Sequence, residues 1–218
     1  AFQHRAVKAG LNILLTDHSN LFTRDWWLPS GDLRDAPGSY RRADVIVVTK
    51  CPEDLSEDER RATVIEINPL EHQQVFFSSI QYGLPYHIIK GNTMTITSRM
   101  EVLLVTGIAN PAPLKKWLNE KAGSYYELAY SDHHIFTIDD LNHMIRRFSH
   151  IAEPNKIILT TEKDAVRLMK FRQELEEWPF YVMPIEPRFL FGEQPRFTDL
   201  IAKFITDFRP SVQAGVDA

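Results

Sequence analysis

The sequence has only one cysteine, Cys51, among 218 residues. A disulfide framework and a zinc site built from cysteines are therefore both excluded within this chain. A single cysteine in a chain of this length is typical of a protein that works in a reducing compartment.

Long apolar runs and an excess of basic residues are also missing. No run reaches the roughly 18 apolar residues of a membrane span, and the short apolar run after Arg5 and Lys8 does not form a signal peptide. The chain has 29 acidic and 25 basic residues and a net charge of −4, whereas dedicated nucleic-acid-binding domains are usually basic. We therefore expect no transmembrane helix and no nucleic-acid partner.

The glycine-rich signatures of nucleotide sites are absent as well. Neither Gly-x-x-x-x-Gly-Lys-Ser/Thr nor Gly-x-Gly-x-x-Gly occurs, and the Gly-x-Ser-x-Gly turn of many serine hydrolases is missing too. The sequence by itself therefore carries no complete nucleotide site and no serine nucleophile of that type.

Apolar runs rich in β-branched residues alternate with segments of helical periodicity, which favours an α/β fold. Gly91-Asn92 favours a hairpin turn between two further short runs, 87–90 and 93–96. The other runs lack polar alternation, as is typical of buried parallel strands, and they lie at 11–17, 44–49, 102–106, 157–160 and 180–183.

Capping signals mark where helices begin. Ser56 followed by Glu59 is a capping-box pattern, and Pro113 suits a first helical turn. Thr137 precedes apolar residues at the i, i+3, i+4 and i+7 spacing of a helix face. A last apolar stripe at 197–208 is interpreted as core packing.

A loop at residues 24–35 combines proline, glycine, two tryptophans and alternating charges. Its structural interpretation is a tight turn with surface ion pairs. Its functional interpretation is a rigid loop that presents Arg34 to a phosphate, because the planar guanidinium suits that anion, with Asp35 orienting the arginine. Composition alone leaves both interpretations open.

Asp132, His133 and His134 follow the strand-like run 125–130. The triplet is compatible with a metal site, an acid–base pair or a polar turn. A metal site needs further ligands at fitting spacing, and the sequence shows none, so we predict no metal here. A carboxylate can fix the tautomer of one imidazole and raise its basicity, which makes one of the two histidines a candidate for acid–base catalysis.

Two more segments follow strand-like runs. Residues 105–111 place Gly107 at the end of a strand, where open α/β sheets border their ligand crevice. Thr161 and Asp164 follow the run 157–160 and are accounted for by a helix cap, which is a structural role.

Together these segments resemble the tetraacyldisaccharide 4'-kinases of lipid A biosynthesis. The loop departs from that family's Leu-Pro-Ala-Gly-Pro-Leu-Arg-Glu, since Ser30, Asp32 and Asp35 replace alanine, proline and glutamate. Six segments in the family's order are more specific than any one of them: Phe2-Gln3-His4-Arg5, 28–35, Arg42-Ala43-Asp44, 105–111, Ser131-Asp132-His133-His134 and 160–164.

The resemblance implies a parallel-sheet α/β fold like that of P-loop kinases, incomplete at the N-terminus, with a smaller α/β domain and a linking β-hairpin. We expect residues 1–84 to be the remainder of the kinase core domain, 85–100 the hairpin linker and 101–218 the C-terminal α/β domain. The family's P-loop and Walker B aspartates precede the position of Ala1. The chain is therefore expected to be a C-terminal portion that is inactive alone.

The family's reaction transfers a phosphoryl group from ATP to the 4'-hydroxyl of tetraacyldisaccharide 1-phosphate. The resemblance thus implies ATP and Mg²⁺ as cofactors of the complete enzyme and that lipid as its substrate. It also implies work at the cytoplasmic face of the bacterial inner membrane, reached through the complete enzyme. The chain itself is expected to be soluble.

The resemblance also implies roles for individual residues. His133 would support deprotonation of the sugar hydroxyl, and Asp132 would orient its imidazole. Gln3 and His4 would lie near the metal and the phosphates. The cleft would be lined by Arg34, which meets a phosphate, and by Asp35.

Two other functions stay open on the residues. One is a stand-alone metal-dependent phosphohydrolase that uses Asp132, His133 and His134. The other is a non-catalytic module that binds lipid or protein.

Overall fold

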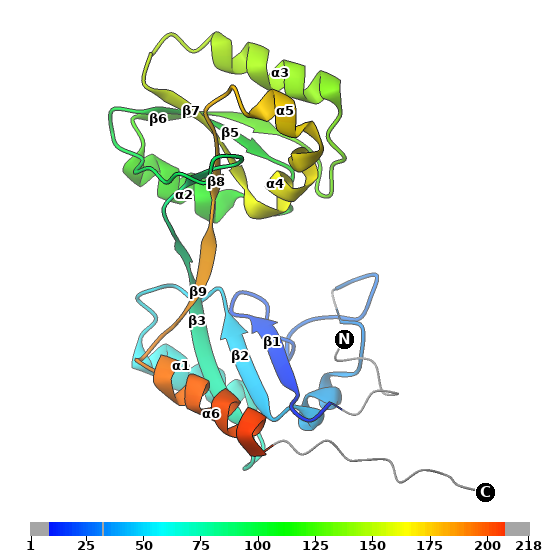
Figure 1. The fold of residues 1–218 in the computed structure, drawn as a ribbon. Coiled ribbons are helices and arrows are strands. Elements are labelled where there is room, and N and C mark those ends of the chain that lie inside the picture. The colour runs from blue at the N-terminus through cyan, green and yellow to red at the C-terminus, as the bar shows by residue number, and fades with distance from the viewer. Residues whose placement is uncertain (1–8, 32, 208–218) are drawn as a thin grey trace, which may run out of the picture. The chain divides into compact units, whose positions relative to one another are not determined.

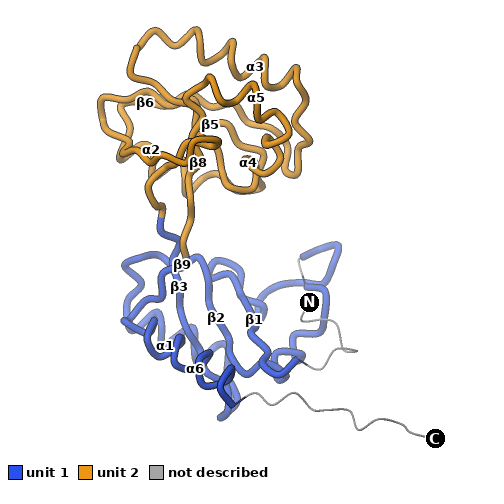
Figure 2. Tube along the Cα trace, in the orientation of Figure 1, with its two compact units in different colours: residues 1–81, 187–218 blue, residues 82–186 orange. Residues whose placement is uncertain are grey.

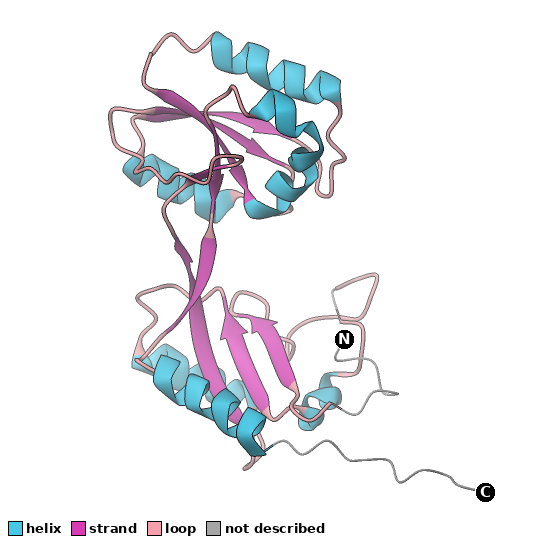
Figure 3. Cartoon of the chain, in the orientation of Figure 1, coloured by secondary structure: helices cyan, strands magenta, loops and turns pink. Residues whose placement is uncertain are grey.

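The computed structural model describes residues 9–31 and 33–207. The chain forms two compact units (Figure 2). The first comprises residues 1–81 and 187–218, and the second comprises residues 82–186. Helices and strands occur in both units (Figure 3). Within the described ranges, no helix has the length and apolar character needed to span a bilayer.

The first unit is built on a sheet whose first three strands are parallel. Leu190 N donates a hydrogen bond to Phe77 O, and Gly83 N donates one to Pro184 O, so the last strand runs antiparallel to its neighbour. The spatial order of the sheet is β1 (Ile13–Asp17), β2 (Val45–Thr49), β3 (Gln74–Tyr82) and β9 (Ile185–Phe189).

Both faces of this sheet are covered, and the four apolar residues of β2, Val45 to Val48, are all buried. Ile46 and Val48 pack in one cluster with Ile67 of α1 (Glu57–Ile67). Val45 and Val47 pack in another cluster that includes residues of α6 (Gln194–Asp207), and both helices are labelled in Figure 1. A short 3-10 helix, η1 (Pro37–Arg42), precedes β2.

The second unit has a sheet in which four strands are parallel and β4 is antiparallel to its neighbour β8. These parallel strands are the apolar runs that the sequence predicts, together with the run 125–130. The spatial order is β4 (Tyr86–His87), β8 (Phe180–Met183), β7 (Lys156–Thr161), β5 (Glu101–Thr106) and β6 (Ser124–Ala129).

Helices cover this sheet on both faces as well. Leu103 and Val105 of β5 pack in a cluster with residues of α3 (Ile138–Ser149), α4 (Glu162–Leu168) and α5 (Arg172–Leu175). Val102 and Leu104 face the opposite side and pack with α2 (Ala112–Lys121). The 3-10 helix η2 (Met169–Phe171) joins α4 to α5. The structure confirms the expected α/β class.

The predicted helix starts are confirmed. Ser56 Oγ accepts a hydrogen bond from Glu59 N, and the Glu59 side chain accepts one from Ser56 N. Thr137 and Asp140 form a second capping box at the start of α3. Each box satisfies amide groups that would otherwise lack a partner in the first turn of a helix.

The division into units differs from the expected domains. Residues 101–218 do not form one unit, because β9 pairs with β3 and the chain from Pro187 onward belongs to the first unit. The stripe of α6 is only partly covered: Phe197 and Leu200 pack against Phe76, Val45 and Val47, and no residue of this helix is fully buried.

The hairpin at Gly91-Asn92 is shorter than expected. Gly91 has a φ of +72°, and the turn closes through a bridge between Tyr86 and Thr93. The ladder does not continue along 87–96, where residues 88–90 form a turn, and the two residues of β4 pair with β8. The segment lies inside the second unit, and β3 and β9 are the connections between units.

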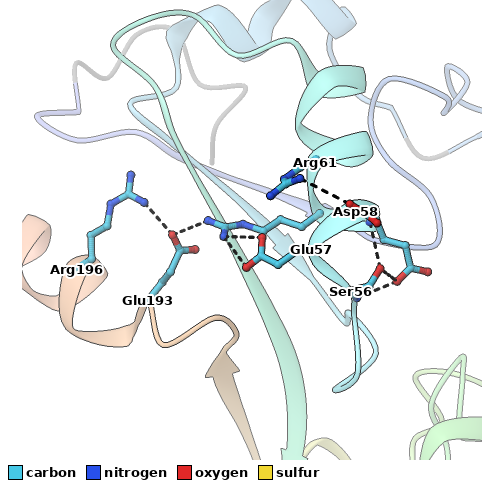
Figure 4. A network of polar contacts seen from close by, with 8 residues as sticks. Ser56, Glu57, Asp58, Arg61, Glu193 and Arg196 are labelled. Atoms are coloured by element: carbon cyan, nitrogen blue, oxygen red, sulfur yellow. Dashed lines mark hydrogen bonds and ion pairs between the residues drawn. The ribbon is translucent and has the colours of Figure 1, made fainter.

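A network of ion pairs attaches the start of α6 to α1 (Figure 4). Glu193 accepts from Arg60 at 2.9 Å and from Arg196 at 2.8 Å. Arg60 also pairs with Glu57 at 3.2 Å, and its guanidinium lies 4.6 Å from the ring centroid of Phe191. These contacts hold the returning C-terminal segment on the first unit.

Candidate active site

Three loops of the second unit converge at one edge of its sheet. Gly107 follows β5, residues 131–134 follow β6, and Asp164 lies in α4 directly after β7. The three strands are adjacent and parallel, so their carboxyl ends meet at the same edge, where open α/β sheets bind ligands. The fold thus joins three of the six segments that carry the resemblance.

Asp164 is the buried anchor of this edge, with a fully buried side chain. Its carboxylate accepts hydrogen bonds from Gly107 N at 2.9 Å and from Thr161 Oγ1 at 2.8 Å. Arg167 Nη1 forms an ion pair with it at 3.1 Å. A buried carboxylate is tolerated only with partners of this kind, so Asp164 fixes the loop after β5 relative to α4. The expected cap by Thr161 is confirmed too, since its hydroxyl accepts from Asp164 N.

Gly107 is closely packed at the end of β5. A Cβ atom there would lie 3.2 Å from Asp164 Oδ1, 3.3 Å from Ser131 O and 3.5 Å from His134 Cβ. Its amide reaches the buried carboxylate because no side chain intervenes.

His133 projects from the loop after β6, and its side chain is 81% exposed. Its Nδ1 lies 3.1 Å from Arg167 Nη2, and its Nε2 lies 3.5 Å from Asp132 Oδ2. The backbone has a φ of +60°, a left-handed conformation that histidine adopts more readily than most residues with a side chain. The predicted neighbours Asp132 and His133 are therefore in contact.

His134 has a separate partner and packs into the unit. Its Nε2 lies 2.9 Å from Asp140 Oδ2, and its ring stacks on Tyr130 with centroids 4.6 Å apart. The ring of His133 contacts Arg167 and Asp132 while that of His134 contacts Asp140, so the two histidines have no partner in common. His134 serves the packing of this loop against α3.

Two groups beside His134 have shifted pKa values. Partial burial acts to raise the pKa of the Asp140 carboxyl, but hydrogen bonds from His134 and Thr137 outweigh it and hold the pKa below its ordinary value. Burial, with a contribution from the Asp140 charge, raises the pKa of Tyr130 to about 12. Tyr130 therefore stays protonated at neutral pH.

The first unit carries its own cleft, of about 370 Å³, at the carboxyl ends of β1 and β2. Asp17 ends β1 and Lys50 follows β2, and these side chains form an ion pair of 2.6 Å. Partial burial acts to raise the pKa of Asp17, but hydrogen bonds from Lys50 and Ser19 overcome it, and the pKa lies below its ordinary value. Arg34 and Asp35 also line this cleft.

Arg34 is an exposed cation of the cleft, as Lys50 is. It makes no hydrogen bond or ion pair with any residue of 9–31 or 33–207. Asp35 pairs with Arg42 at 2.7 Å, which joins two more of the six segments. Orientation of Arg34 by Asp35, one of the expectations from sequence, is therefore not seen in the described part of the chain.

The loop before Arg34 is compact but its apolar side chains are exposed. The backbones of Trp27 and Leu33 pair as an isolated β-bridge. Gly31 packs so closely that a Cβ would lie 2.3 Å from Trp26 O. Trp26 is 71% exposed and Leu28 is 56% exposed. The tight turn is confirmed, and the tryptophans do not belong to the core.

The described residues give little support to other site chemistries. Within 9–31 and 33–207, no three His, Cys, Asp or Glu side chains are grouped to hold a metal ion. Burial raises the pKa of the Cys51 thiol to about 11, which leaves it unreactive at neutral pH. Gln3 and His4 lie outside the described residues.

Sequence reasoning missed four residues that complete these sites. Asp17 ends the apolar run of β1 and Lys50 directly follows that of β2, and this position at the end of a strand is the signal that points to them. Asp140 was predicted by no site motif, although it lies three residues after Thr137 in the capping box. Arg167 follows Asp164 at the i+3 spacing of a helix, but nothing local indicates its contact with His133.

Comparison with known proteins decides the family. A family model described as Tetraacyldisaccharide-1-P 4'-kinase matches residues 1–206. The chain belongs to the tetraacyldisaccharide 4'-kinase family. Two relatives named tetraacyldisaccharide 4'-kinase support the assignment, one from Bacteroides thetaiotaomicron at 37% identity and one from Bacteroides fragilis at 38%.

Each alignment covers 95% of this chain. The chain spans little more than half the length of these kinases, 58% of the B. thetaiotaomicron protein and 57% of the B. fragilis protein. A crystal structure of LpxK from Aquifex aeolicus, described as an "apo" form in complex with ATP, has the same fold with a TM-score of 0.58. That structure is 20% identical, and the match covers 93% of this chain and 55% of the other. The expected family and the P-loop-kinase-like fold are thus confirmed.

Proposed function

We propose that the chain is part of an ATP-dependent kinase that phosphorylates the 4'-hydroxyl of tetraacyldisaccharide 1-phosphate. Its membership of the kinase family supports this function. The observation that carries the proposal is the exposed His133 imidazole at the sheet edge, held between Asp132 and Arg167. An imidazole beside a carboxylate suits the proton transfer that accompanies attack by a sugar hydroxyl.

The chemistry of a kinase is mostly positioning and charge neutralisation. Asp132 and His133 are proposed as the catalytic residues, with His133 supporting removal of the proton from the hydroxyl and Asp132 orienting its ring. His134 is placed outside the chemistry, because its Nε2 pairs with Asp140 and its ring stacks on Tyr130.

ATP with Mg²⁺ is proposed as the phosphoryl donor of the complete enzyme. The described residues fit a polyphosphate to a limited extent, since the cleft of the first unit presents Arg34 and Lys50 but the sequence has no phosphate loop. Arg34 would meet a phosphate there, and Asp35 would keep its loop in place through Arg42. Gln3 and His4 are proposed to lie near the metal and phosphates.

The lipid substrate sets where the enzyme works. We place the complete enzyme at the cytoplasmic face of the inner membrane, as a peripheral protein with no nucleic-acid partner. Because the phosphate loop is absent from the sequence, the chain alone is proposed to be inactive.

The metal-dependent phosphohydrolase is the weaker candidate. It needs several carboxylates around Asp132, His133 and His134, and no such group occurs within the described residues. A non-catalytic binding module remains the other alternative, and the experiment below distinguishes it.

The test uses the complete protein, extended to the length of its relatives, with ATP, Mg²⁺ and tetraacyldisaccharide 1-phosphate. Mass spectrometry of the lipid should show the gain of one phosphate, and the 218-residue chain assayed in parallel should give none. Binding of the lipid without any phosphorylated product would favour the binding module. Release of phosphate from the lipid without ATP would favour the phosphohydrolase.

A further inference from the structure

Arg167 connects a buried carboxylate to an exposed imidazole. Its Nη1 donates to Asp164 at 3.1 Å and to Gly107 O at 3.2 Å, while Nη2 lies 3.1 Å from Nδ1 of His133. The Arg167 side chain is 23% exposed, Asp164 is fully buried and His133 is 81% exposed. The guanidinium therefore extends from the interior to the surface of the sheet edge.

A guanidinium in contact with a neutral histidine fixes which ring nitrogen carries the proton. Arginine has only N–H donors and no acceptor, and it stays charged at any pH of interest. Nδ1 of His133 must therefore accept, and the proton of the neutral ring must be on Nε2. That nitrogen is the one 3.5 Å from Asp132 Oδ2.

The arginine is itself held rigidly. Asp164 is fixed by Gly107 N and by Thr161 Oγ1, so the carboxylate that holds Arg167 has little freedom. The planar fork of arginine uses one nitrogen for this anchor and the other for His133. A lysine has no such fork and could not make both contacts in the same geometry.

We propose that Arg167 is a positioning residue that selects the Nε2–H tautomer of His133, and that Asp164 acts through it. The catalytic consequence rests on the proposed function. With Nδ1 accepting from Arg167, His133 presents a donor at Nε2, which can hydrogen-bond to a carboxylate such as that of Asp132 and cannot itself take the hydroxyl proton at that atom. Arg167 thereby decides which proton-transfer role His133 performs.

Nitrogen NMR of the histidine side chains in the 218-residue chain tests the tautomer directly. The His133 signals are assigned by their loss in His133→Gln, and spectra are compared at a pH where the imidazole is neutral. In the unaltered chain, His133 should be in the Nε2–H form. In Arg167→Gln, the ratio of the Nε2–H to the Nδ1–H form should fall about fivefold, as expected for one lost hydrogen bond.

The matched control is Arg172→Gln in α5. Arg172 is an exposed arginine close to Arg167 in sequence, and its side chain forms no hydrogen bond or ion pair with any other described residue. Its loss removes the same charge and should leave the His133 ratio unchanged. An unchanged ratio in Arg167→Gln, or an equal change in both variants, would overturn the proposal.

Asp164→Asn provides a second, indirect variant. Asp164 forms no hydrogen bond or ion pair with His133, so a change in the His133 tautomer would come through the released arginine. If this variant does not fold, Arg167→Gln still decides the proposal. A folded Asp164→Asn with an unchanged tautomer would contradict the part assigned to Asp164.

Kinetics of the complete enzyme separate this inference from the proposed function. Arg167→Gln should lower kcat while KM for ATP and for the lipid stays within about twofold, because only the positioned imidazole is disturbed. If the complete enzyme transfers no phosphate, the proposed function fails, and the tautomer measured by NMR still decides the role of Arg167.

Discussion

Arg60 of α1 donates a hydrogen bond to Glu193 over 2.9 Å, across 133 positions of sequence. Glu193 lies just before α6, and its side chain is only 9% exposed. The contact therefore ties the segment that returns from the second unit to the helix that follows β2. The same guanidinium stacks over Phe191, so charge and packing act together at this junction.

Arg60→Ala should destabilise the first unit by about 1–3 kcal/mol, because it leaves the nearly buried Glu193 with Arg196 as its remaining partner. Urea unfolding measures the change. The control is the neighbouring Arg61→Ala, whose ion pair with Asp58 is exposed and 3.7 Å long, so it should cost less than about 0.5 kcal/mol. Equal losses in the two variants would contradict a role for the Arg60–Glu193 pair.

Gly107→Ala should destabilise the second unit by about 1–2 kcal/mol, because the added methyl meets a locked carboxylate and a backbone carbonyl that cannot move aside. Thermal unfolding followed by circular dichroism measures it. Gly38→Ala is the control, since no atom lies within 4 Å of its Cβ position, and it should be neutral or slightly stabilising. A neutral Gly107→Ala would show that the Asp164 anchor is not rigid.

Asp140→Asn should reduce stability at pH 7 by about 1 kcal/mol, through the lost charge in the capping box and beside His134. The pKa of Asp140 in the folded chain lies below its ordinary value of 3.8. Its carboxylate therefore contributes stability that is present above about pH 4 and is lost as the pH falls through the lower folded-state pKa.

The difference in unfolding free energy between the unaltered chain and Asp140→Asn should therefore shrink below about pH 4. Denaturant unfolding at a series of pH values measures this trend. Asp139→Asn, an exposed acid in the same helical turn, is the control and should show little dependence. A difference that grows on acidification would have the wrong sign for this account.

Arg34→Gln should raise KM for ATP about tenfold in the complete enzyme without lowering the stability of the chain. The reason is that a charge-assisted contact to phosphate is lost, while Arg34 has no hydrogen bond or ion pair within the described residues. Steady-state kinetics provide the measurement. Arg41→Gln, a nearby exposed arginine outside the cleft lining, should leave KM unchanged. Equal effects of the two would indicate a general charge effect.

The local features of the fold could be predicted from sequence because their partners are close in the chain. Ser56 and Glu59 form a capping box from residues three apart. The predicted strands at 44–49 and 102–106 each contain four consecutive apolar residues, 45–48 and 102–105, as expected where both faces of a sheet are covered. The turn at Gly91-Asn92 was predicted for the same reason.

The remaining features depend on contacts between remote residues. Nothing in the stripe of α6 indicates that it returns to Phe76, and no local signal connects His133 to Arg167, 34 positions later. The candidate residues Asp132, His133, Arg34 and Asp35 came from short motifs and family resemblance, whereas the groups that hold them came only from the fold.

The most direct test of the central claim is the turnover of His133→Gln in the complete enzyme. The control is His143→Gln, an exposed histidine of α3 with no ion pair to another described residue. We predict that His133→Gln lowers kcat at least about a hundredfold with little change in KM, and that His143→Gln retains full activity. Undiminished kcat in His133→Gln would contradict the placement of the chemistry at this sheet edge.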